Sequence, residues 1–167
     1  MRIPTFLTHP WWFSPGQSPL ALLIRLMLAG VFVLEGWQKL VFPELLGAGR
    51  FTRIGIPWPE AMGPFVGVVE LLCGALILIG LFSRYAAVPL IVIMIVAILT
   101  TKAPILIGSD WLIFHVRPLD RYGFWSFAHE TRTDWAMLLG ALYVLLAGAG
   151  PWSCDRVLAR TGMAPVR

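Results

Sequence analysis

The sequence has few charged residues, few histidines and few cysteines. Only 13% of its 167 residues are Asp, Glu, Lys or Arg, whereas 58% are hydrophobic, and the mean hydropathy is +0.78. Soluble domains contain about a quarter charged residues, and a fold of this length could not bury so much apolar surface. The composition therefore excludes an ordinary soluble enzyme, a disordered chain and a nucleic-acid-binding module, and it indicates an integral membrane protein.

The two cysteines and three histidines also limit the redox and metal chemistry. Cys73 lies inside an apolar run and Cys154 lies beyond the end of another, so a disulfide between them is weakly supported. The absence of a CxxC motif leaves thioredoxin-like chemistry and c-type haem attachment unsupported. No apolar run contains a histidine, which argues against a haem held by histidine pairs. We expect no intrinsic metal or cofactor.

Four apolar runs predict an all-α integral membrane protein, a four-helix bundle forming one domain over residues 1–167. A membrane-spanning helix needs about 20 residues, and its backbone must be satisfied within the helix. An interfacial segment (1–19) precedes the spans and a polar tail (151–167) follows them. Both termini are expected on one face and the two longer loops on the other. The predicted spans are residues 20–42, 61–82, 85–107 and 135–150.

The basic residues lie mostly at the ends of the apolar runs, as expected for a multi-pass membrane protein. The net charge of +4 is better explained by lipid anchoring at the ends of the spans than by nucleic-acid binding. Five arginines lie on each predicted side of the membrane, so the positive-inside rule gives little orientation. Arg25, near the start of the first span, favours cytoplasmic termini.

Charged residues inside the predicted spans are the main functional signal. Such residues are costly and usually face the protein interior or a water-filled cavity. At a rise of 1.5 Å per residue, Glu35 and Glu70 lie about 10 Å and about 13 Å from the long-loop end. Lys39 follows Glu35 by four residues, on the same face. The resulting candidate polar pocket contains Glu35, Lys39, Glu70, Thr100, Thr101 and Lys102.

Two interpretations of this pocket stay open. The charges could hold an anion, relay a proton or bind a quinone head group. Alternatively, they could form an internal ion pair that fixes the register of the helices, with Lys39 extending to the interface. The stripe Gly63, Gly67, Gly74 shares a face with Glu70 and predicts close helix packing.

A polar segment precedes the fourth predicted span. Its side chains could form a loop rim that gates a ligand, or a charged interfacial cap in which Thr133 or Asp134 begins the helix. A zinc-protease site is excluded because the second histidine of HExxH is absent. The rim residues are His129, Glu130, Arg132 and Asp134.

Several motifs in order along the chain resemble those of the DoxX family of small bacterial and archaeal membrane proteins. The first span carries an Arg, Gly, Phe, Gly, Lys pattern, the next loop a Gly-x-Pro, the second span Glu-Leu-x-x-Gly, and the C-terminal region Gly-x-Gly-x-x-Ser-x-Asp. The residues are Arg25, Gly30, Phe32, Gly36, Lys39, Gly55, Pro57, Glu70, Leu71, Gly74, Gly148, Gly150, Ser153 and Asp155. The resemblance covers about residues 20–158.

The resemblance implies a four-helix, multi-pass subunit of the bacterial inner membrane that is associated with a respiratory or thiol redox system. Quinone is the cofactor this implies, and a redox protein or a second copy of the chain is the partner. Whether the protein is itself an enzyme stays open. The alternative is a non-catalytic anchor or assembly factor that docks a redox protein on aromatic residues of the third loop, and a small transporter is less favoured. The aromatic residues are Trp111, Phe114, Phe124, Trp125 and Phe127.

Overall fold

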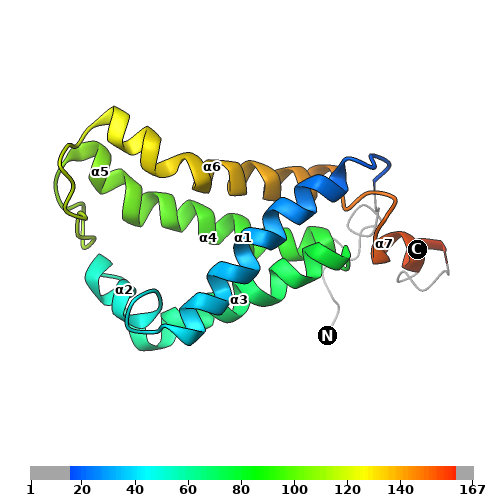
Figure 1. Ribbon diagram of the computed structural model, residues 1–167, viewed down its shortest axis with the longest axis horizontal. Helices are drawn as coiled ribbons and strands as arrows, with labels where there is room; N and C mark the ends of the chain where they lie inside the picture. The colour runs from blue at the N-terminus through cyan, green and yellow to red at the C-terminus, as the bar shows by residue number, and fades with distance from the viewer. Residues whose placement is uncertain (1–15, 161–167) are drawn as a thin grey trace, which may run out of the picture.

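The computed structural model describes residues 16–160 (Figure 1). Within that range the regular structure is helical, and the β-type pairing is limited to one isolated bridge between Trp111 and Phe114. The predicted all-α class is therefore confirmed. Most of the predicted interfacial segment (1–19), and residues 161–167 of the predicted tail, lie outside the described residues.

Three helical segments are long and apolar enough to cross a membrane. They are α1 (Ala21–Val41), α3 (Pro59–Ile79) and the continuous segment Ser83–Ile107. No more than 33% of each apolar stretch is buried inside the protein, so most of its side chains need an apolar solvent such as lipid. The bounds agree with the first three predicted spans to within a few residues.

The third of these segments changes its helical geometry near the long-loop end. It consists of α4 (Ser83–Ala97), a π-helical turn η2 (Ile98–Lys102) and α5 (Ala103–Ile107). A π turn widens the helix locally and is often found at functional sites. It includes the Thr-Thr-Lys sequence of the candidate pocket.

The fourth long helix, α6 (Phe124–Ala147), begins well before the predicted residue 135. The prediction that Thr133 or Asp134 caps its start is wrong, because Gly123 precedes the helix. Thr131 is fully buried and continues the inward-facing row of Met137, Ala141 and Val144. The row of side chains that face the core therefore continues into the polar segment. A search for apolar runs does not detect this part of the helix. By length and composition α6 does not join the three candidate spans of the described chain, because its first half is polar.

Two short helices occupy regions predicted as loop and tail. The first, α2 (Ala48–Ile54), lies between α1 and α3, and the second, α7 (Cys154–Arg160), follows α6. Both cysteines are free: Cys73 is half-buried in α3 and Cys154 is exposed at the start of α7.

The long helices lie side by side (Figure 1). Helix α1 packs along α3, α4 packs on α3 and α6, and α6 also contacts α1. Their shared core includes Leu28, Phe32, Ile77, Leu90 and Val144. The first turn of α1 and α7 lie at one end of the molecule, and α2 and α5 lie at the other. We call these the α7 end and the α2 end.

A buried arginine satisfies free helix carbonyls at the α7 end. Arg25 is 2% exposed, and its Nε donates to the carbonyl of Ile77 at 2.8 Å. Its Nη2 donates to the carbonyl of Leu78 at 2.5 Å, and its Nη1 to that of Trp152 at 2.6 Å. Carbonyls at a helix C-terminus lack partners within the helix. Arg25 therefore joins the end of α3 to the segment that follows α6.

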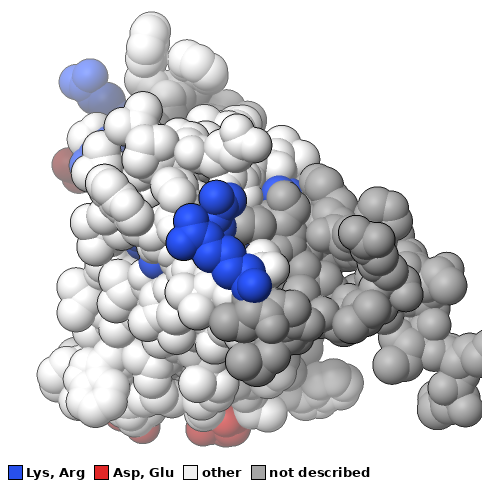
Figure 2. Space-filling model, turned by 90° about the vertical axis from the view of Figure 1, so that its right-hand side faces the viewer, with Lys and Arg blue, Asp and Glu red and all other residues white. Residues whose placement is uncertain are grey.

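Arg84 and Asp155 complete this end. Arg84 donates to the carbonyls of Leu145 and Leu146 at the end of α6. Asp155 accepts from the backbone N–H groups of Phe82 (2.7 Å) and Ser83 (3.1 Å), so it caps α4 from a distant part of the chain. Figure 2, viewed from this end, shows basic side chains on a mostly uncharged surface.

Candidate functional site

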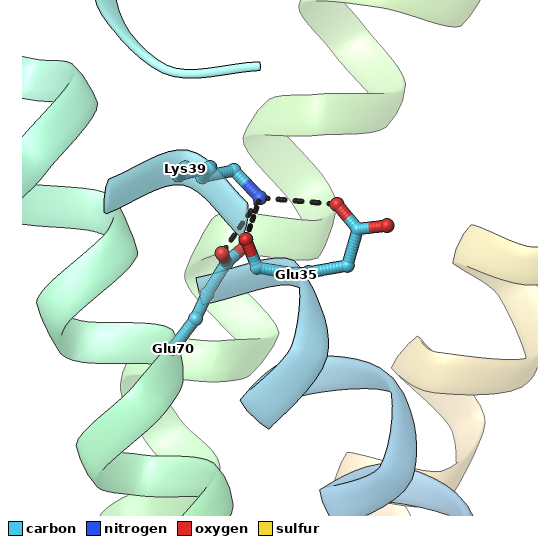
Figure 3. A network of polar contacts seen from close by, with 3 residues as sticks. All are labelled: Glu35, Lys39 and Glu70. Atoms are coloured by element: carbon cyan, nitrogen blue, oxygen red, sulfur yellow. Dashed lines mark hydrogen bonds and ion pairs between the residues drawn. The ribbon is translucent and has the colours of Figure 1, made fainter. Parts of the chain in front are cut away.

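Lys39, in the last turn of α1, lies between two carboxylates (Figure 3). Its Nζ is 2.7 Å from Oε2 of Glu70 on α3 and 3.3 Å from Oε2 of Glu35, one turn earlier on α1. The Glu70 side chain is 3% exposed, whereas that of Glu35 is 46% exposed. The structure thus brings together three of the six predicted pocket residues, with Glu70 enclosed and Glu35 at the edge.

Glycines allow the two helices to approach at this point. A Cβ on Gly36 would lie 2.5 Å from the carbonyl oxygen of Gly67, and one on Gly67 would lie 3.2 Å from Cβ of Lys39. Larger residues would push α1 and α3 apart. The structure places the other two glycines of the stripe at contacts as well, Gly63 against the backbone of Ala48 and Gly74 against Val33.

The three remaining pocket residues form a separate group on η2. Thr101 donates its hydroxyl to the carbonyl of Ala97 at 2.6 Å, and Lys102 pairs with Asp134 of α6 at 3.4 Å. Thr100 is buried, and its hydroxyl has no hydrogen-bond partner. Across the described residues, no hydrogen bond or ion pair joins this group to Lys39. The six residues of the predicted pocket are therefore not joined into one hydrogen-bonded network.

A cavity of about 400 Å³ opens at the α2 end between α2, the η2–α5 segment and the loop after α5. Apart from Thr101 its polar lining is basic, and the rest is aliphatic. The basic residues are Arg50, Arg53, Lys102, His115 and Arg117. Only Lys102 and Thr101 of this cavity were predicted as site residues. For Arg50 and Arg53, the signal in the sequence is their spacing of three positions just before the Gly-x-Pro motif. This spacing places both on one face of a short helix.

The loop that forms one wall of the cavity is held by Asp110. The Asp110 carboxylate is 2.9 Å from Nδ1 of His115 and accepts the N–H of Val116 at 2.8 Å. The hydrogen bond with the His115 side chain lowers the pKa of Asp110 below its usual value. The hydrogen bond from the Val116 N–H lowers it further. The contact is solvent-exposed, so it orders the loop and adds little to global stability.

The predicted rim residues lie on the first turns of α6 and not in a loop. Glu130 pairs with Arg117 at 2.8 Å, and Asp134 pairs with Lys102. Arg132 donates to the carbonyl of His129 at 2.5 Å. The rim carboxylates of Glu130 and Asp134 thus pair with two cations of the cavity lining. His129 and Arg132 are not part of that lining. Between residues 16 and 160, no three His, Cys, Asp or Glu side chains are grouped closely enough for a metal ion.

Comparison with known proteins agrees with the resemblance drawn from the motifs. The DoxX family model matches residues 20–103. The chain is also similar to an uncharacterized membrane protein of Mycobacterium tuberculosis, with 44% identity over 146 residues, 87% of this chain and 85% of that protein. No solved structure matches the chain. The matched region contains α1, α3, α4 and the Lys39–Glu70 pair, and the chain belongs to the DoxX family.

Proposed function

We propose that this protein is a membrane subunit of a respiratory or thiol redox system that binds a quinone or small anion near Lys39. The observation that supports the proposal best is the ammonium group of Lys39 held between Glu35 and the enclosed Glu70. Charged groups inside membrane helices are rare, and they often mark substrate or proton pathways.

The donor set fits the head group of a quinone. Reduction of a quinone needs hydrogen-bond donors at its oxygens and a supply of protons. Lys39 is a cationic donor, and the partly exposed Glu35 carboxylate gives the network an edge through which a proton can exchange. The same ammonium group could hold a small anion if Glu70 became protonated.

The proposal includes a fourth crossing of the membrane by α6. The helix has 24 residues, about 36 Å at 1.5 Å per residue, which is enough to cross the hydrocarbon core. Its charged residues Glu130 and Asp134 would then be paired with Arg117 and Lys102. Four crossings would place the start of α1 and α7 on one side of a bacterial inner membrane, and Arg25 favours the cytoplasmic side.

An aromatic patch supports a second candidate function, the anchoring of a partner redox protein. Trp125 is 83% exposed and Phe124 is 61% exposed at the start of α6. Large aromatic side chains are typical anchors of protein interfaces. In this case the subunit would hold a partner without binding a quinone. Loss of a co-purifying redox protein in Trp125→Ala, with quinone binding absent from the wild type, would favour it.

A quinone-binding measurement on the purified full-length protein in mild detergent tests the first proposal. We expect a short-chain benzoquinone to bind, and both Glu70→Gln and Lys39→Met to weaken binding by about tenfold or more, because a charged hydrogen bond contributes about 1.5–3 kcal/mol. Glu60→Gln, which removes an exposed carboxylate in the first turn of α3, serves as the matched control. Equal affinity in all three variants would show that the site is wrong.

A further inference from the structure

The cavity at the α2 end carries an unbalanced positive charge. Four permanent cations line it, Arg50, Arg53, Lys102 and Arg117, and its lining within residues 16–160 includes no carboxylate. Like charges grouped in a small space repel one another. Such a cavity is stabilised when an anion enters it.

Two of the cations have carboxylate partners, but those partners lie on α6, outside the cavity lining. Lys102 Nζ is 3.4 Å from Asp134, and Arg117 Nη2 is 2.8 Å from Glu130. These pairs fix the position of both cations. Lys102 and Arg117 themselves line the cavity, whereas Glu130 and Asp134 are not part of its lining.

The two arginines of α2 lack carboxylate partners. Arg53 donates only to backbone carbonyls, those of Glu44 at 3.2 Å and Leu45 at 2.8 Å, which are neutral. Arg50 is half-buried and makes no hydrogen bond or ion pair with any residue from 16 to 160. The two arginines are three positions apart in the sequence, so they share a face of α2. Guanidinium groups bind phosphate and carboxylate oxygens through paired donors.

We propose that this cavity binds a phosphate-type oxyanion, with Arg50 and Arg53 as its main ligands and Lys102 and Arg117 as supporting cations. The inference goes beyond the proposed function, because these side chains lie outside the Lys39 network and no redox chemistry is needed. The anion can come from a free phosphate or from the head group of an anionic lipid. The aliphatic part of the lining, which includes Leu45, Leu46 and Ile105, would suit the glycerol and first acyl carbons of a lipid.

Binding of inorganic phosphate to the purified full-length protein in a neutral detergent tests the site. Sodium phosphate should raise the melting temperature above that in sodium chloride of equal ionic strength. Arg50→Gln and Arg53→Gln should each weaken the apparent phosphate affinity by about tenfold, and Arg50→Lys should weaken it less. Arg121→Gln removes an exposed arginine outside the cavity and should leave the affinity unchanged. Arg117→Gln, in an exposed loop, replaces the α2 variants if either fails to fold.

A second experiment identifies the source of the anion. The protein is placed in phosphatidylcholine nanodiscs with and without phosphatidylglycerol, and phosphate binding is measured again. Displacement of phosphate by phosphatidylglycerol in the wild type assigns the cavity to a lipid head group, and undiminished phosphate binding assigns it to a free anion. Either result supports the site. The proposal is overturned if Arg50→Gln, Arg53→Gln and Arg121→Gln bind phosphate and phosphatidylglycerol alike. Quinone binding that survives Arg50→Gln would separate this site from the one at Lys39.

Discussion

Lys39 illustrates how a single residue can serve both structure and chemistry. Its ammonium group is removed from bulk water, so the cost of desolvation must be offset by the carboxylates of Glu70 and Glu35. A buried pair of this kind fixes the register of α1 on α3, whether or not a ligand binds. Removal of one partner is costly, because the remaining charge keeps its desolvation penalty without compensation.

The pair Lys39–Glu70 should therefore behave non-additively. We expect Lys39→Met and Glu70→Gln each to lower the free energy of unfolding by about 3–5 kcal/mol, and the double variant to cost clearly less than their sum, because it leaves no unpaired charge. Unfolding of the purified protein by increasing mole fractions of a denaturing detergent measures all three. Purely additive losses would mean that the two side chains do not interact in the folded protein.

At the scale of secondary-structure elements, two kinds of contact hold the helices together. Near the α2 end, Gly36 and Gly67 bring α1 and α3 into backbone contact. At the α7 end, Arg25, Arg84 and Asp155 satisfy helix termini that would otherwise be buried without partners. Several residues that carry the DoxX resemblance thus have a structural role, and the functional interpretation is confined to the α2 end.

The crossing of α1 and α3 predicts a contrast between two glycines of one helix. Gly36→Ala should lower the free energy of unfolding by about 1–3 kcal/mol, because its methyl group has no space between the backbones. Gly30→Ala should be neutral or slightly stabilising, since nothing lies within 4 Å of a Cβ at that position. Thermal unfolding in detergent compares the two variants, and equal stability would contradict the close approach.

At the scale of the whole molecule, polar groups are divided between two ends. The α7 end uses its buried charges to close helix termini, whereas the α2 end contains the Lys39 network, the π turn and the basic cavity. The apolar surface between them faces lipid, because most of each candidate span is not buried by other helices. Any ligand should therefore bind at the α2 end.

A fourth crossing by α6 predicts that the two ends are reached from opposite sides of the membrane. In a Cys73→Ala background, the exposed Cys154 near the α7 end should react with a membrane-impermeant maleimide in inverted vesicles and not in intact spheroplasts. With Ser109→Cys in the loop after α5, and Cys154→Ser, the pattern should reverse. Labelling of both positions from one side would show that α6 does not cross.

Much of the fold could be predicted because the apolar runs at α1, α3 and Ser83–Ile107 are long and contain few charges. The Lys39 network could be predicted in part, since Glu35 and Lys39 are one turn apart and Glu70 lies at a similar depth. The early start of α6 could not be predicted from the sequence, because its first turns bury only one face and that face includes the polar Thr131. No apolar run marks such a segment.

The sequence by itself determined that this is a helical membrane protein of the DoxX family, because composition and motif order depend only on the chain. The tertiary structure alone decided which charges meet. It separated Lys102 from Lys39 and paired it with Asp134. It also brought Arg50 and Arg53 of α2 to a cavity shared with Arg117, more than sixty residues away along the chain. The physical reason is that ion pairing depends on distances of a few ångströms between side chains, and packing of helices far apart in sequence sets those distances.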